Sequence, residues 1–228
     1  MTQAIYRFMP VGEPQPLRWS NGLGTTSELV RHPQDAAEVS AADPTFVFSF
    51  RSAPICALPV EGGPPNREVD FSPLPGIDRH LLVAQWDIEG IRLDHGANGS
   101  QDVTELFQVV SFSGDWVTKC VLAGDKALDF NLMVHRERAR AVFLAHQFGA
   151  KDGAVELPLD ADFHVLHFFS GNAHVALAGG AGMVHAAPHR TGETLYLMRD
   201  QSATAPAKLI FHPWGDPLVL IGVSVYLK

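Results

Sequence analysis

The chain has 228 residues, of which 46% are hydrophobic and 18% are charged, a composition typical of a globular protein and not of a disordered one. Its formal net charge is −8 and no segment concentrates lysine or arginine, so neither nucleic acid nor a membrane surface is an expected partner. Two cysteines, Cys56 and Cys120, are too few for a disulfide framework, and no apolar run is long enough to span a bilayer, so we expect a cytoplasmic protein.

Strand signals dominate both halves of the chain. Short segments rich in aromatic and β-branched residues, bounded by Gly, Pro, Asp or Ser, predict strands; they are 45–51, 80–83, 106–110, 116–122, 141–148, 163–169, 174–177, 194–198, 209–212 and 218–227. The best helical candidate, 131–140, lacks a regular apolar stripe. The Pro- and Gly-rich segment 58–67 is expected to be a surface loop. The pattern predicts a largely antiparallel β architecture, either a sandwich or small barrels.

The most unusual local chemistry lies in segment 18–29, whose sequence is RWSNGLGTTSEL. It combines an aromatic plate at Trp19, an amide at Asn21, a glycine at Gly22 that permits close backbone approach, and a hydroxyl at Thr25. These groups suit a loop that touches a ligand. They equally suit a bulged strand entry whose side chains satisfy their own turn. The spacing matches neither a dinucleotide-binding fingerprint nor a phosphate loop.

Arg51 ends an otherwise apolar strand in which phenylalanines occupy every second position. If those phenylalanines share one face, Arg51 lies on the other face, which in a barrel is the inside. A guanidinium inside a barrel is suited to clamp a carboxylate, whereas an arginine at the surface pairs with a nearby acid.

Four further polar residues lie in two of the predicted strand and turn segments. Asp78 and Arg79 follow a Pro-Gly turn, where the plain interpretation is that Asp78 caps the turn and Arg79 pairs locally. Asp129 and Asn131 are expected to serve turns, although Asn131, between two large apolar residues, is also placed to face a cavity.

Metal and nucleophile signatures are missing from the sequence. No two of the 11 histidines are two residues apart, and His164 and His167, three apart, would point to opposite faces of a regular strand. There is no GxSxG elbow, and neither cysteine is flanked by an obvious base. We therefore expect no metal, no cofactor and no nucleophilic catalysis.

Taken in order, five motifs resemble the HutD/Ves family. They are WSNGLGTTSEL (19–29), FSFRSAPI (48–55), FSPLPGIDRHLLV (71–83), FSGDWVTKCVLAG (112–124) and DFNLMVHR (129–136). The resemblance implies an all-β bicupin fold over 1–228, with two small antiparallel β-barrels, an N-terminal one near 1–136 and a C-terminal one near 137–228, without the usual cupin metal ligands.

The resemblance also implies a function and a ligand-binding set. Family members belong to histidine-utilisation systems, where they are thought to limit pathway expression by binding urocanate or formylglutamate, and Ves-like members are linked to stress responses. The positions of this sequence that match the family motifs are Trp19, Asn21, Gly22, Thr25, Arg51, Asp78, Arg79 and Asn131. The leading hypothesis is a non-catalytic protein that binds a small carboxylate, with a homodimer as the candidate assembly.

Two other classes of function remain open at this point. A cupin-type isomerase or hydrolase acting on a related acid would use Asp78 or a histidine as general acid or base, because cupins host many chemistries. A partner-binding regulator with a vestigial pocket could use the exposed Pro/Gly loop near Pro64.

Overall fold

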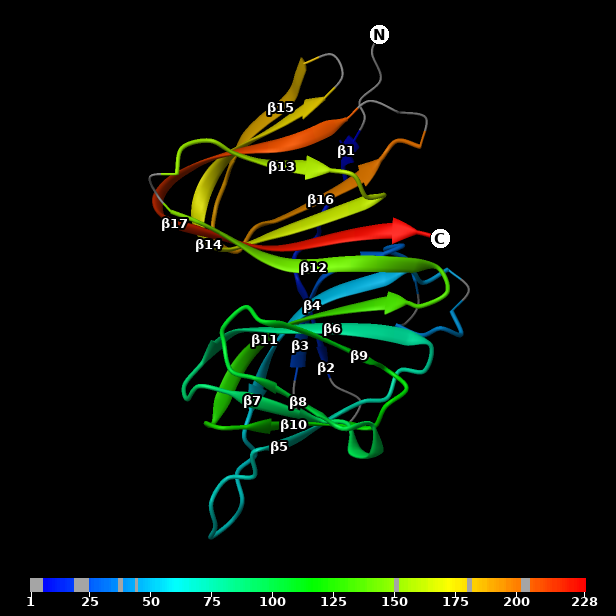
Figure 1. The fold of residues 1–228 in the computed structure, drawn as a ribbon, viewed down its shortest axis with the longest axis vertical. Coiled ribbons are helices and arrows are strands. Elements are labelled where there is room, and N and C mark those ends of the chain that lie inside the picture. The colour runs from blue at the N-terminus through cyan, green and yellow to red at the C-terminus, as the bar shows by residue number, and fades with distance from the viewer. Residues whose placement is uncertain are drawn as a thin grey trace. The chain divides into compact units, whose positions relative to one another are not determined.

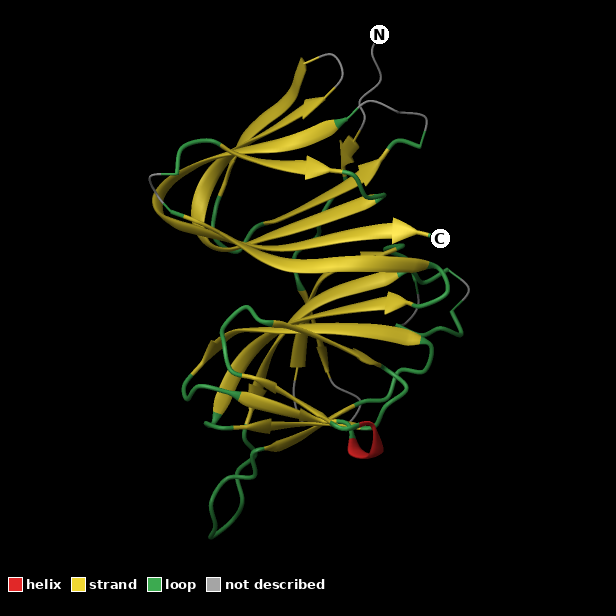
Figure 2. Ribbon diagram, in the orientation of Figure 1, coloured by secondary structure: helices red, strands yellow, loops and turns green. Residues whose placement is uncertain are grey.

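The computed structural model describes residues 6–18, 25–36, 39–43, 45–149, 152–179, 182–201 and 206–228. Within these ranges the chain is built from antiparallel strands, with one short 3-10 turn, η1 (Gly96–Asn98) (Figure 2). The chain divides into two compact units: a first unit over 12–140, and a second unit made of the residues up to 11 together with 141–227. No helix among the described residues has the length and apolar character needed to cross a membrane.

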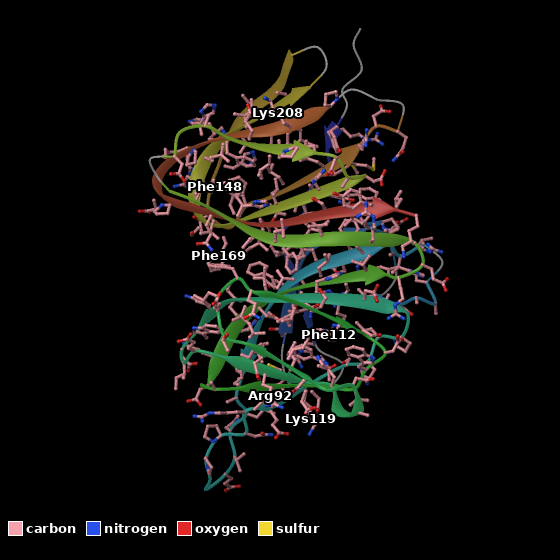
Figure 3. All side chains as sticks on the ribbon, in the orientation of Figure 1. Arg92, Phe112, Lys119, Phe148, Phe169 and Lys208 are labelled. Carbon is pink, nitrogen blue, oxygen red and sulfur yellow. The ribbon has the colours of Figure 1, made fainter. Side chains whose placement is uncertain are left out.

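The first unit contains a six-stranded and a four-stranded sheet (Figure 1). The six-stranded sheet has the order β2 (Gln15–Arg18), β3 (Thr25–His32), β4 (Phe48–Cys56), β11 (Lys126–His135), β6 (Ile77–Trp86) and β9 (Val109–Ser113). The four-stranded sheet has the order β5 (Glu68–Phe71), β10 (Thr118–Leu122), β7 (Ile91–Asp94) and β8 (Ser100–Val103). Side chains from both sheets form one apolar core, which includes Leu81, Leu93 and Phe112, the last labelled in Figure 3.

Alternation of side chains explains the difference between outer and central strands. In β7, Ile91 and Leu93 are buried whereas Arg92 and Asp94 are exposed, the pattern of a half-buried strand. In contrast, β11 lies between β4 and β6 and is buried along most of its length. Polar residues of β11 are therefore held inside the protein.

The second unit is one seven-stranded sheet built on two long, bent strands (Figure 1). Its order is β1 (Tyr6–Phe8), β16 (Thr194–Arg199), β14 (Phe163–Gly179), β17 (Ala207–Leu227) and β12 (Ala139–Phe148), while β13 (Val155–Leu159) pairs with β17 and β15 (Gly182–His189) pairs with β14. The register of β14 against β17 shifts on both sides of Ser170. There Gly171 has φ +76°, and a Cβ would lie 2.6 Å from the Pro217 carbonyl oxygen, so this bend requires glycine.

The all-β bicupin prediction is confirmed in class, with two adjustments. The described strands form three sheets with open edges, which do not close into complete barrels. The boundary between the units falls near residue 140, and the first strand joins the second unit because β1 pairs with β16. The prediction of a helix over 131–140 is wrong, because these residues belong to β11, a turn and β12. Pairing with buried neighbours on both sides prevails there over local propensity.

Two buried histidines predict acid sensitivity of the second unit. Burial lowers the pKa of His164 and that of His167 to about 4, and their ring Nδ1 atoms lie 3.0 Å from Ser224 Oγ and 2.9 Å from Thr194 Oγ1. Because an unfolded histidine has a pKa of about 6.5, the unfolded state takes up protons first as the pH falls, so stability is lost from about pH 6.5 down to about pH 4.

At pH 5 the expected loss is roughly 2 kcal/mol for each of these histidines. When the pH is lowered from 7.5 to 5, the free energy of unfolding of His167→Asn should therefore rise by about 2 kcal/mol relative to that of the wild type. Urea unfolding at each pH measures this difference. A difference between variant and wild type that does not change with pH would contradict the prediction.

Candidate functional site

The core-facing side of the six-stranded sheet carries a group of polar residues on neighbouring strands. In the sheet register, Asn131 of β11 lies directly opposite both Arg51 of β4 and Leu81 of β6. Asp129 lies two residues along β11, on the same side. Since Leu81 belongs to the apolar core, these polar side chains share its face.

One end of the group is an ion-pair network around Glu28. Its Oε2 accepts hydrogen bonds from Arg51 Nη2 at 2.9 Å and from Ser49 Oγ at 2.8 Å, and Arg31 Nε lies 2.9 Å from its Oε1. Burial alone would raise the pKa of Glu28, but the charge of Arg51 and the hydrogen bonds from Arg31 and Ser49 outweigh it and lower that pKa. Glu28 is therefore a stable anion that two arginines share.

Arg79 lies on the same face without such a partner. Its guanidinium carbon is 4.9 Å from the centre of the Phe71 ring and 5.2 Å from that of Phe112. One nitrogen, Nη1, donates a long 3.4 Å hydrogen bond to the Ser72 carbonyl oxygen, and the buried Nε has no hydrogen-bond partner. The side chain is 7% exposed, and burial lowers its pKa only to about 10, so it stays charged at neutral pH.

Asp129 and Asn131 complete the group with unpartnered acceptors. Both are buried, and the Oδ1 atom of each lacks a hydrogen-bond partner. Burial raises the pKa of Asp129 to about 7, against the opposing charge of Arg79. Buried polar atoms without partners are rare in folded proteins, so three of them on one sheet face indicate a place for water or a ligand.

The balance of charge in this group is positive. We call it the arginine cluster and define it by Glu28, Arg31, Arg51, Arg79, Asp129 and Asn131. Three guanidinium groups face one fully ionised carboxylate and a second, Asp129, that is about half protonated at neutral pH. An anion, above all a carboxylate with its two acceptor oxygens, would neutralise the excess. Within the described ranges, no three His, Cys, Asp or Glu side chains are grouped to hold a metal ion.

The structure brings together three of the sequence-predicted site residues, Arg51, Arg79 and Asn131. Asp78, next to Arg79 on β6, points to the other side of the sheet, where its Oδ1 accepts a 2.6 Å hydrogen bond from Arg136 Nε. Thr25 is exposed at the start of β3, outside the cluster. Trp19, Asn21 and Gly22 lie outside the described residues.

Sequence reasoning missed Glu28 and Asp129. It assigned Asp129 to a turn, but the residue lies inside β11. The available signal was the pair of polar residues at 129 and 131, two apart within an apolar run, which places both on one face of a strand. That face also carries Arg51.

Two β units, each with its own apolar core, and a buried arginine cluster in the first define a bicupin-type protein with a polar site in one unit. Solved structures share this fold. A conserved protein of unknown function from Pseudomonas aeruginosa PAO1 is 18% identical, with 98% of this chain and 99% of that chain covered and a TM-score of 0.70. HutD from Pseudomonas fluorescens SBW25, solved in a formate condition, is 17% identical, with 98% and 99% covered and a TM-score of 0.61.

A family model described as HutD matches residues 12–208, and the chain belongs to the HutD family. An uncharacterised 21.2 kDa protein of Pseudomonas putida, described as lying in the hutC 3' region, is 29% identical over 161 residues, covering 71% of this chain and 72% of that protein. The sequence resemblance is thereby confirmed.

Proposed function

We propose that the chain binds a small carboxylate metabolite at the arginine cluster and acts, like HutD, in histidine utilisation. The observation that carries this proposal is Arg79, a buried and charged guanidinium with no acidic hydrogen-bond partner and an unused Nε donor. The relatives support it: the family is HutD, and one curated relative is described by its position beside hutC.

Urocanate and formylglutamate, the ligands implied by the resemblance, suit the donors and acceptors of the cluster. Each has a carboxylate for Arg79 and an N–H group for the free Oδ1 of Asn131. Arg51 has a different role from the clamp expected from sequence, because its Nε and Nη2 are occupied by Glu28. It adds positive potential and keeps Nη1 for a second contact.

Ligand binding should stabilise the protein, and Arg79 should be required for it. A ligand at 100 times its Kd raises the free energy of unfolding by about 2.7 kcal/mol. We expect a thermal shift with urocanate or formylglutamate, and at least a roughly tenfold weaker affinity in Arg79→Gln, because a charge-assisted hydrogen bond is lost. Calorimetric titration measures the affinity directly.

Arg92→Gln is the matched control. Arg92 is an exposed arginine on β7, labelled in Figure 3, whose Nη2 donates a hydrogen bond to Ser100 Oγ. Its replacement should leave ligand affinity unchanged. Circular dichroism verifies that Arg79→Gln is folded. Equal loss in both variants, or no binding of either acid by the folded wild type, would refute the proposal.

Asp129 favours one second candidate, an enzyme acting on the same acid. A carboxyl group with a pKa of about 7 beside a guanidinium is suited to general acid–base catalysis near neutral pH. The test is consumption of urocanate or formylglutamate by the purified protein. Turnover that Asp129→Asn abolishes, with binding retained, would establish the enzyme, and binding without turnover would exclude it for these acids.

A further inference from the structure

The second unit has a pocket of its own, between strands β12, β13, β14 and β17, which are labelled in Figure 1. Its volume is ≈ 50 Å³, and one water molecule needs roughly 10–15 Å³ on this measure. Most of its wall is aliphatic: Val142 and Leu144 come from β12, Leu157 and Leu159 from β13, and Leu166 from β14. Such a wall holds water poorly and favours an apolar group.

Three polar side chains also line the pocket, and two of them are already satisfied. Ser224 Oγ and His164 Nδ1 are 3.0 Å apart, and His164 Nε2 accepts the Ala161 N–H at 3.2 Å. His146 differs, since it makes no hydrogen bond to any described residue. It stacks on Phe148 with ring centres 6.2 Å apart and an angle of 10° between the ring planes.

Gly222 fixes where the His146 ring lies. A Cβ at residue 222 would be 3.0 Å from His146 Nε2 and 3.1 Å from its Cδ2. The missing side chain lets the ring lie against β17, at the edge of the aliphatic wall. Burial lowers the pKa of His146, so the ring is neutral at physiological pH and offers one N–H donor and one acceptor nitrogen.

We propose that this pocket binds a small uncharged molecule with an apolar body and one hydroxyl group, which forms a hydrogen bond with His146. A carboxylate does not suit it, because no Arg, Lys, Asp or Glu is among the residues that line it. A pure hydrocarbon would leave the imidazole nitrogens desolvated without a partner. The site is separate from the arginine cluster and does not depend on the function proposed for that cluster.

Phenol and toluene test the role of His146, because they match in shape and only phenol has a hydroxyl. Binding to the full-length protein is measured by saturation-transfer NMR and by the ¹⁵N shifts of the His146 ring. His146→Phe keeps an aromatic ring but removes both nitrogens. We expect it to weaken phenol binding about fivefold and not to weaken toluene binding. Equal losses for the two probes, or undiminished phenol binding in His146→Phe, would overturn the hydroxyl assignment.

Leu144→Trp tests the location of the site without disturbing the core. Leu144 is 47% exposed, so a larger ring can fill the pocket mouth, and Leu106→Trp at a 41% exposed leucine of the first unit is the matched control. Phenol binding should fall at least tenfold in Leu144→Trp and stay unchanged in Leu106→Trp and Arg79→Gln. The proposal fails if phenol does not bind the wild type or binds both tryptophan variants equally.

Discussion

Replacing Glu28 by glutamine should lower the free energy of unfolding by about 3 kcal/mol, because it removes the only fully ionised carboxylate of the arginine cluster. Arg51 donates two hydrogen bonds to Glu28, and Arg31 approaches from the other side. Glutamine is nearly the same size but carries no charge. The two guanidinium groups would remain largely buried without their counter-ion, and that cost exceeds what the ion pair itself contributes.

Glu68→Gln is the control for this prediction. Glu68 pairs with Lys119 at 3.2 Å, and both side chains are about half exposed. Such surface pairs contribute about 0 to 1 kcal/mol. In urea unfolding, the loss of stability in Glu28→Gln should therefore be several times the loss in Glu68→Gln. A Glu28→Gln protein as stable as Glu68→Gln would show that the cluster tolerates its positive charge unaided.

The strands and the face of Arg51 could be predicted from the sequence, because both follow from alternation. Phe48 and Phe50 are fully buried on one side of β4, and Arg51 takes the core-facing side of the first unit. The same rule separates two residues that the motif resemblance had grouped. Asp78 and Arg79 are adjacent on β6, so their side chains must point to opposite faces, and only Arg79 joins the cluster.

Glu28 could not be found in this way because a bulge in β3 changes the register. The pairing of β3 with β4 shifts between Glu28 and Val30. Residues three apart on a regular strand point to opposite faces, yet Glu28 and Arg31 contact each other across this shift. Such a bulge depends on the partner strand, which starts about 20 residues later in the chain. Neighbouring residues in the sequence do not specify it.

The largest pH effect that we expect in the first unit comes from Asp129. Its pKa is about 7 in the folded protein, whereas an unfolded aspartate has a pKa of about 3.9. Between these values the folded state binds one proton more than the unfolded state. The stabilisation that Asp129 gives is thus complete below about pH 4 and is lost as the pH rises through about 7. The loss in the free energy of unfolding amounts to about 4 kcal/mol at pH 8.

Asp129→Asn should abolish this dependence, because asparagine resembles the protonated acid and does not titrate. Between pH 4 and pH 8, the free energy of unfolding of the variant should rise by about 4 kcal/mol relative to that of the wild type. Urea unfolding or hydrogen exchange of β11 amides measures this gain. Asp102→Asn, at an exposed position on β8, should show no such trend. The gain should grow when a carboxylate ligand occupies the cluster and keeps Asp129 protonated at pH 8, because the folded state then holds still more protons relative to the unfolded state. A constant difference between variant and wild type at every pH would mean that Asp129 is ionised in the folded protein, with Arg79 as its counter-ion, and Arg79 would then have no charge left for a ligand.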